Sequence, residues 1–524
     1  MKAWIRQCTA THEGCMHAAR PLYDRRLPTR PLDTGPLDDL SPHFRIVSTT
    51  EMDSATTNFA ALSHCWGPHP LLRTLTTNFN AHCHSIAASV LPKSFVEAAA
   101  VARNLRIRYL WIDSLCIIQD LSSDWEREAA TMGSVYSNAE LTIAATGASD
   151  GTKGLFLQRP EMEKPVRIPY RDGTIHLAMP TPRSTGEIDN SPLDTRASIT
   201  QEWLLSSRVL HFTEAQMVWS CVSTTESEDG RRMYTTEPER LRELLAWSGI
   251  GPLEELEASE MHEDWAYIVQ SYCSRNLTYL TDRPVATAGF AQVLENRWTE
   301  RYHHGPWFPA DAAREFDPGQ LLWYGKPPDT GSSPAATAFM LASDPRAVSR
   351  PGSLAHIPTW SWQSVLGRIG YYAPTDHPRS LVSLVSVGQD EKELGIEAVC
   401  FPLHWPVFGP VKGDTNLGAR YPYTGHFSLS ATGLYVYPHG MYLLGSDEER
   451  IGWVSVDLQR VPQKNEEVWC CAVSCNVVDG GRKGGVNVLL LRRLGKGKFS
   501  RLGMGELLDY VSVMEKEKIP VRIG

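Results

Sequence analysis

Apolar runs and polar breaks alternate regularly between residues 58 and 160. Three short apolar runs have the composition of strands buried on both faces: FAALS (59–63), RYLWI (108–112) and LTIAA (141–145). The segments between them, residues 91–105 and 123–138, carry apolar side chains at helical spacing. The order strand, helix, strand, helix, strand with short links predicts a parallel α/β sheet.

Both helical segments begin with a capping-box pattern. Ser94 precedes Glu97 by three residues, and Ser123 precedes Glu126 by the same spacing. We therefore expect each serine to cap its helix.

Ligands of open parallel sheets bind beyond the carboxyl ends of the strands. This rule selects three loops as the candidate site: residues 63–67, 113–124 and 146–151.

The rest of the chain has a different pattern. Residues 1–57 are rich in Pro, Thr and Asp, and residues 160–365 mix helical stretches with Pro-rich loops. Several apolar runs after about residue 366 predict strands. We predict four parts: an extended lead-in (1–57), an α/β domain (58–215), a mixed helical and loop extension (216–365) and a β-rich domain (366–524).

Composition narrows the classes of partner and compartment. The 524 residues carry a net charge of −9, which offers no basic face for nucleic acid or an anionic membrane. The N-terminus lacks the apolar core of a signal peptide, and no run approaches the roughly 18 apolar residues of a membrane helix. The eleven cysteines are scattered, which favours a reducing compartment. We expect a cytoplasmic protein.

Glu128 is the first catalytic candidate. It lies at the edge of an apolar helical stripe, whereas Glu126 points away from it. The stripe consists of Trp125, Ala129, Met132, Tyr136 and Ala139. A carboxylate at such a position commonly has a shifted pKa or a fixed partner. The alternative is a structural ion pair with a nearby basic residue: Arg103, Arg106 or Arg108.

Two further candidates follow the strand at 108–112. Asp113 ends this strand, where α/β enzymes present acids to ligands; the alternative is that it caps the turn at Ser114 or pairs with an arginine. Cys116 could act as a nucleophile with His64 as its base. Its place inside the run LCII favours a buried thiol of the core instead.

The turn after the first strand supplies candidate binding residues. Ser63, His64, Trp66 and Gly67 surround a predicted close approach of the backbone, and the Trp66 indole could stack on a ring or pack in the core. With Ser114 they form the predicted substrate-binding set.

Metal and nucleotide motifs are mostly absent. Cys8, His12 and Cys15 have the spacing of zinc ligands, but no fourth ligand is evident downstream, so we predict no metal centre. The chain has no phosphate-binding loop, no HExxH and no GxSxG.

Several spaced blocks together resemble the fungal heterokaryon incompatibility (HET) domain. They include FAALSHCWG (59–67), RYLWIDSLCIIQD (108–120), QEWLLSSRVLHF (201–212) and IPTWSWQS (357–364). The chain departs from the family pattern at Ser198, where an Arg-x-Trp motif before Gln201 and Glu202 would place a tryptophan; Trp203 is a candidate substitute.

The resemblance implies a role in self/non-self recognition and regulated cell death, with protein partners or self-association. HET domains have been proposed as remote relatives of TIR (Toll/interleukin-1 receptor) domains, which implies a TIR- or flavodoxin-like sheet. In TIR domains that cleave NAD, the catalytic glutamate lies on a helix placed like that of Glu128. No cofactor is implied, and NAD would be a substrate.

Three functional hypotheses therefore stay open. The first is a signalling module that acts by protein association. The second is a TIR-like NAD hydrolase with Glu128 at its centre. The third is a biosynthetic tailoring or condensing enzyme, acting on a small molecule of secondary metabolism, that uses Asp113, Glu128 or Cys116.

Overall fold

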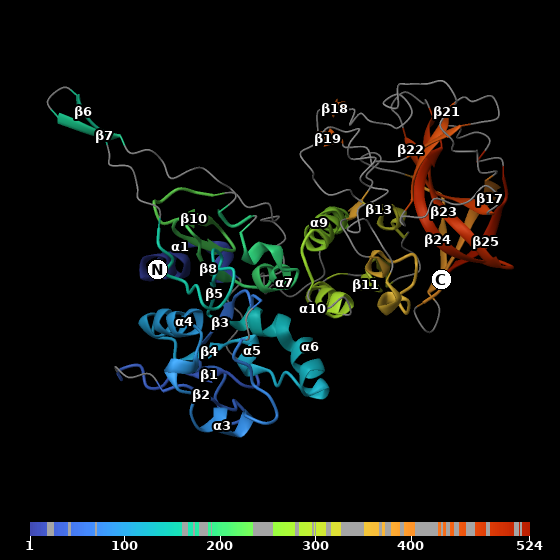
Figure 1. Ribbon diagram of the computed structural model, residues 1–524. Coiled ribbons are helices and arrows are strands. Elements are labelled where there is room, and N and C mark those ends of the chain that lie inside the picture. Colours follow the sequence, from blue (N-terminus) through green and yellow to red (C-terminus); the bar gives the residue numbers. More distant parts are fainter. Residues whose placement is uncertain are drawn as a thin grey trace. The chain divides into compact units, whose positions relative to one another are not determined.

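The computed structural model divides the chain into two compact units, each described separately below (Figure 1). The first contains residues 1–251, 275–277 and 285–294, and the second contains 252–274, 278–284 and 295–524. This division differs from the predicted boundary near 365. The structure describes residues 1–17, 26–39, 43–68, 71–159, 166–170, 173–177, 187–189, 191–233, 255–277, 282–295, 298, 300–310, 316–325, 351–365, 369–371, 379–387, 392–403, 428–430, 433–435, 441–444, 450–456, 467–477, 483–507, 513 and 516–524.

Helices and strands occur throughout both units. The helices are α1 (Lys2–Thr11), α2 (Glu13–His17), α3 (Phe79–His84), η2 (Ala88–Val90), α4 (Lys93–Asn104), α5 (Asp113–Cys116), α6 (Ser122–Asn138), η4 (Leu193–Thr195), α7 (Ser198–Leu204), α9 (Glu255–Cys273), α10 (Asp282–Glu295), η5 (Pro318–Leu321), η6 (Gly352–Leu354) and η7 (Trp362–Ser364). The strands of the first unit are β1 (Leu32–Asp33), β2 (Arg45–Ile46), β3 (Phe59–Ser63), β4 (Tyr109–Trp111), β5 (Leu141–Ala144), β6 (Val166–Tyr170), β7 (Gly173–Leu177), β8 (Arg208–Phe212), β9 (Met217–Cys221) and β10 (Thr225–Ser227). Those of the second are β11 (Glu300–Tyr302), β12 (Trp307–Pro309), β13 (Trp323–Gly325), β14 (Ile369–Tyr371), β15 (Arg379–Ser380), β16 (Ser383–Val387), β17 (Leu394–Leu403), β18 (Ser428–Ser430), β19 (Gly433–Tyr435), β20 (Met441–Leu444), β21 (Arg450–Val456), β22 (Val468–Val477), β23 (Lys483–Gly495), β24 (Lys498–Leu507) and β25 (Lys518–Ile523).

An eight-stranded sheet in the order β10-β9-β8-β5-β3-β4-β1-β2 organises the first unit. Its four central strands are parallel, because β3 pairs with β4 and β5, and β5 pairs with β8, in the same direction. All three predicted strands are present, and α4 and α6 lie on opposite sides of them (Figure 1). The predicted α/β class with a parallel sheet is therefore confirmed.

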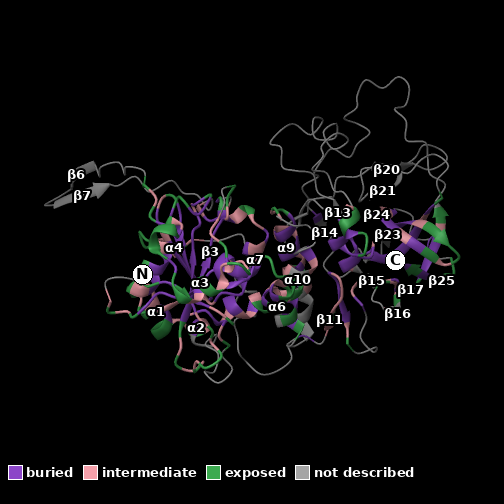
Figure 2. Ribbon diagram, turned by 60° about the horizontal axis from the view of Figure 1, so that its bottom comes forward, coloured by how far each residue is buried: buried purple, intermediate pink, exposed green. Residues whose placement is uncertain are grey.

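The centre of this sheet is buried on both faces. Every residue of β3 and β5 is buried, which explains why their sequences read as continuous apolar runs. Figure 2 shows these strands in purple, with exposed positions on the outer faces of the helices. Because β3, β4 and β5 run parallel, their carboxyl ends lie at one edge of the sheet, where the predicted loops begin.

Neither predicted capping box forms. Helix α4 begins at Lys93 without a side-chain cap, and the Glu97 carboxylate accepts hydrogen bonds from the backbone amides of Leu155 and Phe156. Helix α6 also lacks a side-chain cap, and both Ser123 and Glu126 are exposed. At α4, a tertiary contact of Glu97 has replaced the local capping pattern.

The N-terminal segment differs from the predicted extended lead-in. Residues 2–17 form α1 and α2, and residues 32–33 and 45–46 add β1 and β2 to the sheet. Prolines 28, 31, 36 and 42 lie after the helices, so they do not prevent them.

The second unit contains the strand-rich C-terminal part that the sequence predicts. Five of its strands pair in a closed ring: β17 with β22, β22 with β23, β23 with β24, β24 with β25, and β25 with β17. Closure leaves these strands no free edge within the ring. In the part of the chain that the structure describes, no helix has the length and apolar composition needed to cross a bilayer.

Candidate functional site

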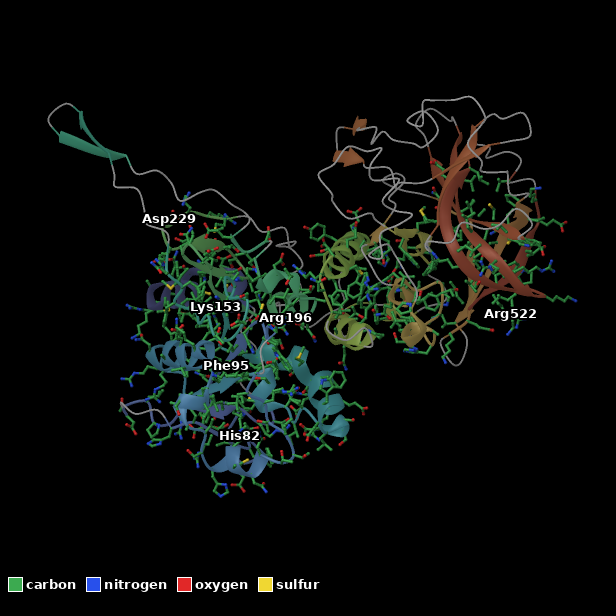
Figure 3. The ribbon with its side chains drawn as sticks, viewed as in Figure 1. His82, Phe95, Lys153, Arg196, Asp229 and Arg522 are labelled. Carbon is green, nitrogen blue, oxygen red and sulfur yellow. The ribbon has the colours of Figure 1, made fainter. Side chains whose placement is uncertain are left out.

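A group of polar side chains gathers at the carboxyl edge of the parallel strands. We call it the carboxyl-edge cluster; it consists of Ser63, His64, Trp66, Asp113, Tyr136, Arg196 and Glu202. These residues come from the end of β3 and the loop after it, from the start of α5, from α6, and from the segment around α7. Figure 3 labels Arg196, just before α7, and Phe95 on α4, which contacts this cluster.

Glu202 is held by hydroxyl donors. Ser63 Oγ donates a 2.5 Å hydrogen bond to Glu202 Oε2, and both residues are buried. The Tyr136 hydroxyl also bonds to Glu202; burial, followed by the nearby carboxylates, raises the pKa of Tyr136 well above its usual value. Tyr136 therefore stays protonated and acts as a donor.

Asp113 presents the most accessible carboxylate of the cluster. Its Oδ2 accepts a 2.9 Å hydrogen bond from Trp66 Nε1, and its Oδ1 accepts one of 2.7 Å from the Ser114 amide. Its side chain retains 20% of its exposure. Burial raises the pKa of Asp113, against the opposing effects of Arg196 and the Trp66 bond. A carboxyl group with a raised pKa at a strand end can serve as a general acid.

His64 is a buried neutral imidazole. Its ring meets the edge of Phe95 at a centroid distance of 5.0 Å. Burial, followed by the charge of Arg196, lowers the pKa of His64 to about 3. Its Nδ1 lies 3.9 Å from Asp113 Oδ1, beyond hydrogen-bond reach. With such a low pKa, this imidazole is a weak base near neutral pH.

The burial of His64 makes stability depend on pH. The unfolded chain takes up this proton near pH 6.5, whereas the folded chain does so only near pH 3. The contribution of neutral His64 to the free energy of unfolding is therefore fully present above about pH 6.5. It is lost as the pH falls below that value, by up to about 1.4 kcal/mol per pH unit. We expect the free energy of unfolding, measured with urea between pH 7.5 and 5.5, to fall more steeply with decreasing pH in the wild type than in His64→Gln. Equal slopes in the two proteins would contradict a buried neutral His64. The titration of Asp113 contributes equally to both proteins and therefore cancels in the comparison.

Arg196 is the cation of the cluster. It donates to the backbone carbonyl of His64. Burial alone would lower the pKa of Arg196, but the carboxylates of Glu202 and Asp113 outweigh it and raise that pKa. One guanidinium thus balances two carboxylates around the end of β3.

Glu128 is paired at a different place. Its Oε1 lies 3.4 Å from Arg30 Nη2 and 3.3 Å from Arg127 Nη2. Arg30 also binds Asp124 at 2.5 Å and the Cys116 carbonyl at 3.1 Å. The ion pair that was the alternative for Glu128 does form, although with partners other than the predicted ones. Arg103, Arg106 and Arg108 instead bind the segment at residues 33–39.

The remaining predicted residues are buried at the same edge. Cys116 is buried, which raises the pKa of its thiol to about 12, and it accepts a hydrogen bond from the Ile112 amide. This environment fits the core interpretation better than a thiolate nucleophile. Ser114 is also buried, and its hydroxyl has no hydrogen-bond partner among the described residues.

Gly67 brings two of the predicted loops together. Its φ of +72° favours glycine, and a Cβ there would lie 2.3 Å from the Asp150 Cβ. The loops at 63–67 and 146–151 therefore touch at Gly67.

A comparison with protein families covers the region that contains this cluster. Residues 59–202 match the family model described as heterokaryon incompatibility protein (HET). This segment is a HET domain. Every member of the carboxyl-edge cluster lies inside the matched range, from Ser63 to Glu202. Neither the curated proteins nor the solved structures contain a match to the chain.

Three members of the carboxyl-edge cluster were not among the predicted site residues. Glu202 is a position of the family pattern and Tyr136 belongs to the predicted apolar stripe, but no local pattern connects them, or Arg196, to Ser63 or Asp113. Ser198, at the departure from the family pattern, begins α7 and is half-buried. Trp203 is buried and packs edge-on against His211 at 4.9 Å, so it fills core space near α7.

Proposed function

We propose that this chain is an incompatibility-type protein whose HET domain signals a cell-death response by associating with another protein chain. The observation that supports association over catalysis is the pairing of Glu128 with Arg30 and Arg127. A carboxylate held by two guanidinium groups is engaged in structure, and among the described residues its polar partners are Arg30 and Arg127.

An exposed aromatic residue supplies a contact surface for such association. Phe156, which follows the loop at 146–151, is 53% exposed, and its ring meets Phe212 edge-on at 5.7 Å. Phe212 ends β8 at the carboxyl edge of the parallel strands. An exposed ring held in place by a core ring loses little entropy on binding, which suits a contact residue.

Conditional expression in a filamentous fungus tests this proposal. The full chain is compared with Phe156→Ala and Glu128→Gln, and cell death is scored with a dye that enters dead cells. We expect Phe156→Ala to reduce killing at least tenfold and Glu128→Gln to retain it, at matched protein levels and matched thermal stability. Glu126→Gln, which changes an exposed carboxylate on the same helix, is the control. Retained killing by Phe156→Ala would overturn the proposed contact.

An enzymatic function is the second candidate, and a specific observation favours it. Asp113 combines a raised pKa, residual exposure and a bond to the Trp66 indole, a combination that suits binding and protonation of a ring-containing substrate. NAD is the first substrate to test, through nicotinamide release by the purified wild type, Asp113→Asn and Glu128→Gln. Turnover that is lost in Asp113→Asn alone would place catalysis at Asp113. Loss in Glu128→Gln alone would restore the TIR-like hypothesis, and no turnover in the wild type would favour association or the tailoring-enzyme hypothesis.

A further inference from the structure

Four potential metal ligands meet outside the matched HET range. Cys8 lies on α1, His12 in the break after it and Cys15 on α2, while Cys221 ends β9 more than 200 residues later. One ligand atom from each lies within 4.8 Å of all the others. His12 Nδ1 is 3.3 Å from Cys221 Sγ. Cys221 thus supplies the fourth potential ligand, which the sequence did not reveal.

The ligand set and its spacing suit zinc. A tetrahedral Zn²⁺ with Zn–S bonds near 2.3 Å and Zn–N bonds near 2.0 Å separates its ligand atoms by roughly 3.5–3.8 Å. The observed grouping needs shifts of an ångström or less to reach that geometry. Three thiolates and one imidazole are a common structural zinc set, and four protein ligands leave no position for a substrate.

Local structure holds the two halves of the set together. Trp4 on α1 stacks on Trp219 of β9 with a centroid distance of 6.3 Å. A Cβ at Gly14 would lie 2.9 Å from Ser223 Oγ, so α2 approaches the turn after β9 as closely as glycine permits. That turn is closed by a 2.9 Å bond from the Cys221 amide to the Thr224 carbonyl.

A cation and a hydroxyl group lie next to the cysteine sulfurs of the four-residue set. The guanidinium of Arg208, on β8, interacts with the Cys8 sulfur, and its Nε has no other partner among the described residues. Ser223 Oγ lies 3.6 Å from Cys15 Sγ. Zn²⁺ with three thiolates carries one net negative charge, which a neighbouring guanidinium offsets. Such outer contacts orient ligands and stabilise the thiolate form.

We propose that Cys8, His12, Cys15 and Cys221 hold one structural Zn²⁺ that fastens α1 and α2 to the β9 edge of the sheet. The ion links the N-terminus to a strand beyond the matched HET range. Zinc removal would loosen this edge and leave the carboxyl-edge cluster in place.

Metal analysis of the full chain tests the proposal. The protein is purified without chelator, incubated with Zn²⁺ and desalted, and its zinc content is measured by mass spectrometry. We expect close to one zinc per chain in the wild type and in Cys83→Ser, which alters a half-buried thiol of α3 outside the set. Cys221→Ser should lose most of the zinc. A strong chelator should lower the Tm of the wild type and of Cys83→Ser.

Cobalt substitution keeps the test decisive if Cys221→Ser does not fold. The wild type loaded with Co²⁺ should show the visible absorption of a tetrahedral site together with thiolate charge-transfer bands. A folded wild type without bound zinc and without these bands would overturn the proposal. A disulfide between two of these sulfurs, found as a loss of two hydrogen atoms in the intact mass and located by peptide mapping, would overturn it too, because it would consume two of the ligands.

Discussion

Replacing Arg196 with methionine is expected to lower the free energy of unfolding by about 3–5 kcal/mol. The guanidinium is the cation beside Glu202 and Asp113, and it also donates to the His64 carbonyl. Removing it leaves two carboxylates in a desolvated setting with one countercharge fewer, and a buried uncompensated charge is costly. Urea unfolding at pH 7.5 measures the loss.

A surface arginine provides the matched control for this experiment. Arg159 pairs with Glu228 at 2.7 Å, but the two side chains are 50% and 37% exposed. Arg159→Met should therefore cost about 0–1 kcal/mol. If Arg196→Met cost no more than Arg159→Met, the carboxylates of the cluster would have to be hydrated or protonated in the folded protein.

The second large effect is expected at Arg30. Its guanidinium binds both Asp124 and Glu128, and its side chain is only 11% exposed. Arg30→Met should lower the free energy of unfolding by about 3–5 kcal/mol, because it leaves two buried carboxylates on one helix with a weaker countercharge. Arg127 contacts the same pair but is 54% exposed, so Arg127→Met should cost about 0–1 kcal/mol.

A double-mutant cycle separates structure from catalysis at Glu128. If Glu128 serves mainly to pair with Arg30, the cost of Arg30→Met should shrink in a Glu128→Gln background by about 1 kcal/mol or more. Additive costs would mean that Asp124 alone pairs with Arg30. The Glu128 carboxylate would then be available for chemistry.

These experiments bear on how far a sequence locates a site. That the three strand-end loops meet at one edge of the sheet was predictable, because buried strands with short links leave few alternatives for a parallel sheet. The partners of each side chain were not predictable. Glu97 has capping-box spacing yet bonds the backbone near residue 155, and Glu128 pairs with Arg30, which lies almost 100 residues earlier.

The proposed zinc ligands also show that sequence does not reveal the spatial partners of a side chain. Cys8, His12 and Cys15 are neighbours in sequence, so their spacing was visible, but three ligands alone did not justify a metal. Cys221 joins them because α1 packs against β9, where Trp4 stacks on Trp219. Nothing in its own sequence neighbourhood, MVWSC, marks it as a ligand.

The sequence by itself determined what depends on local periodicity and family pattern: the α/β class, the parallel strands, the strand-rich C-terminal part and the HET domain. The tertiary structure decided what depends on contacts between distant segments. These include the division of the chain near residue 251, the grouping of Ser63, Asp113, Arg196 and Glu202, and the meeting of Cys221 with the N-terminal helices. The physical reason is that apolar spacing records which face of an element is buried. The partner of a buried polar group is set by the packing of whole elements, which local sequence does not encode.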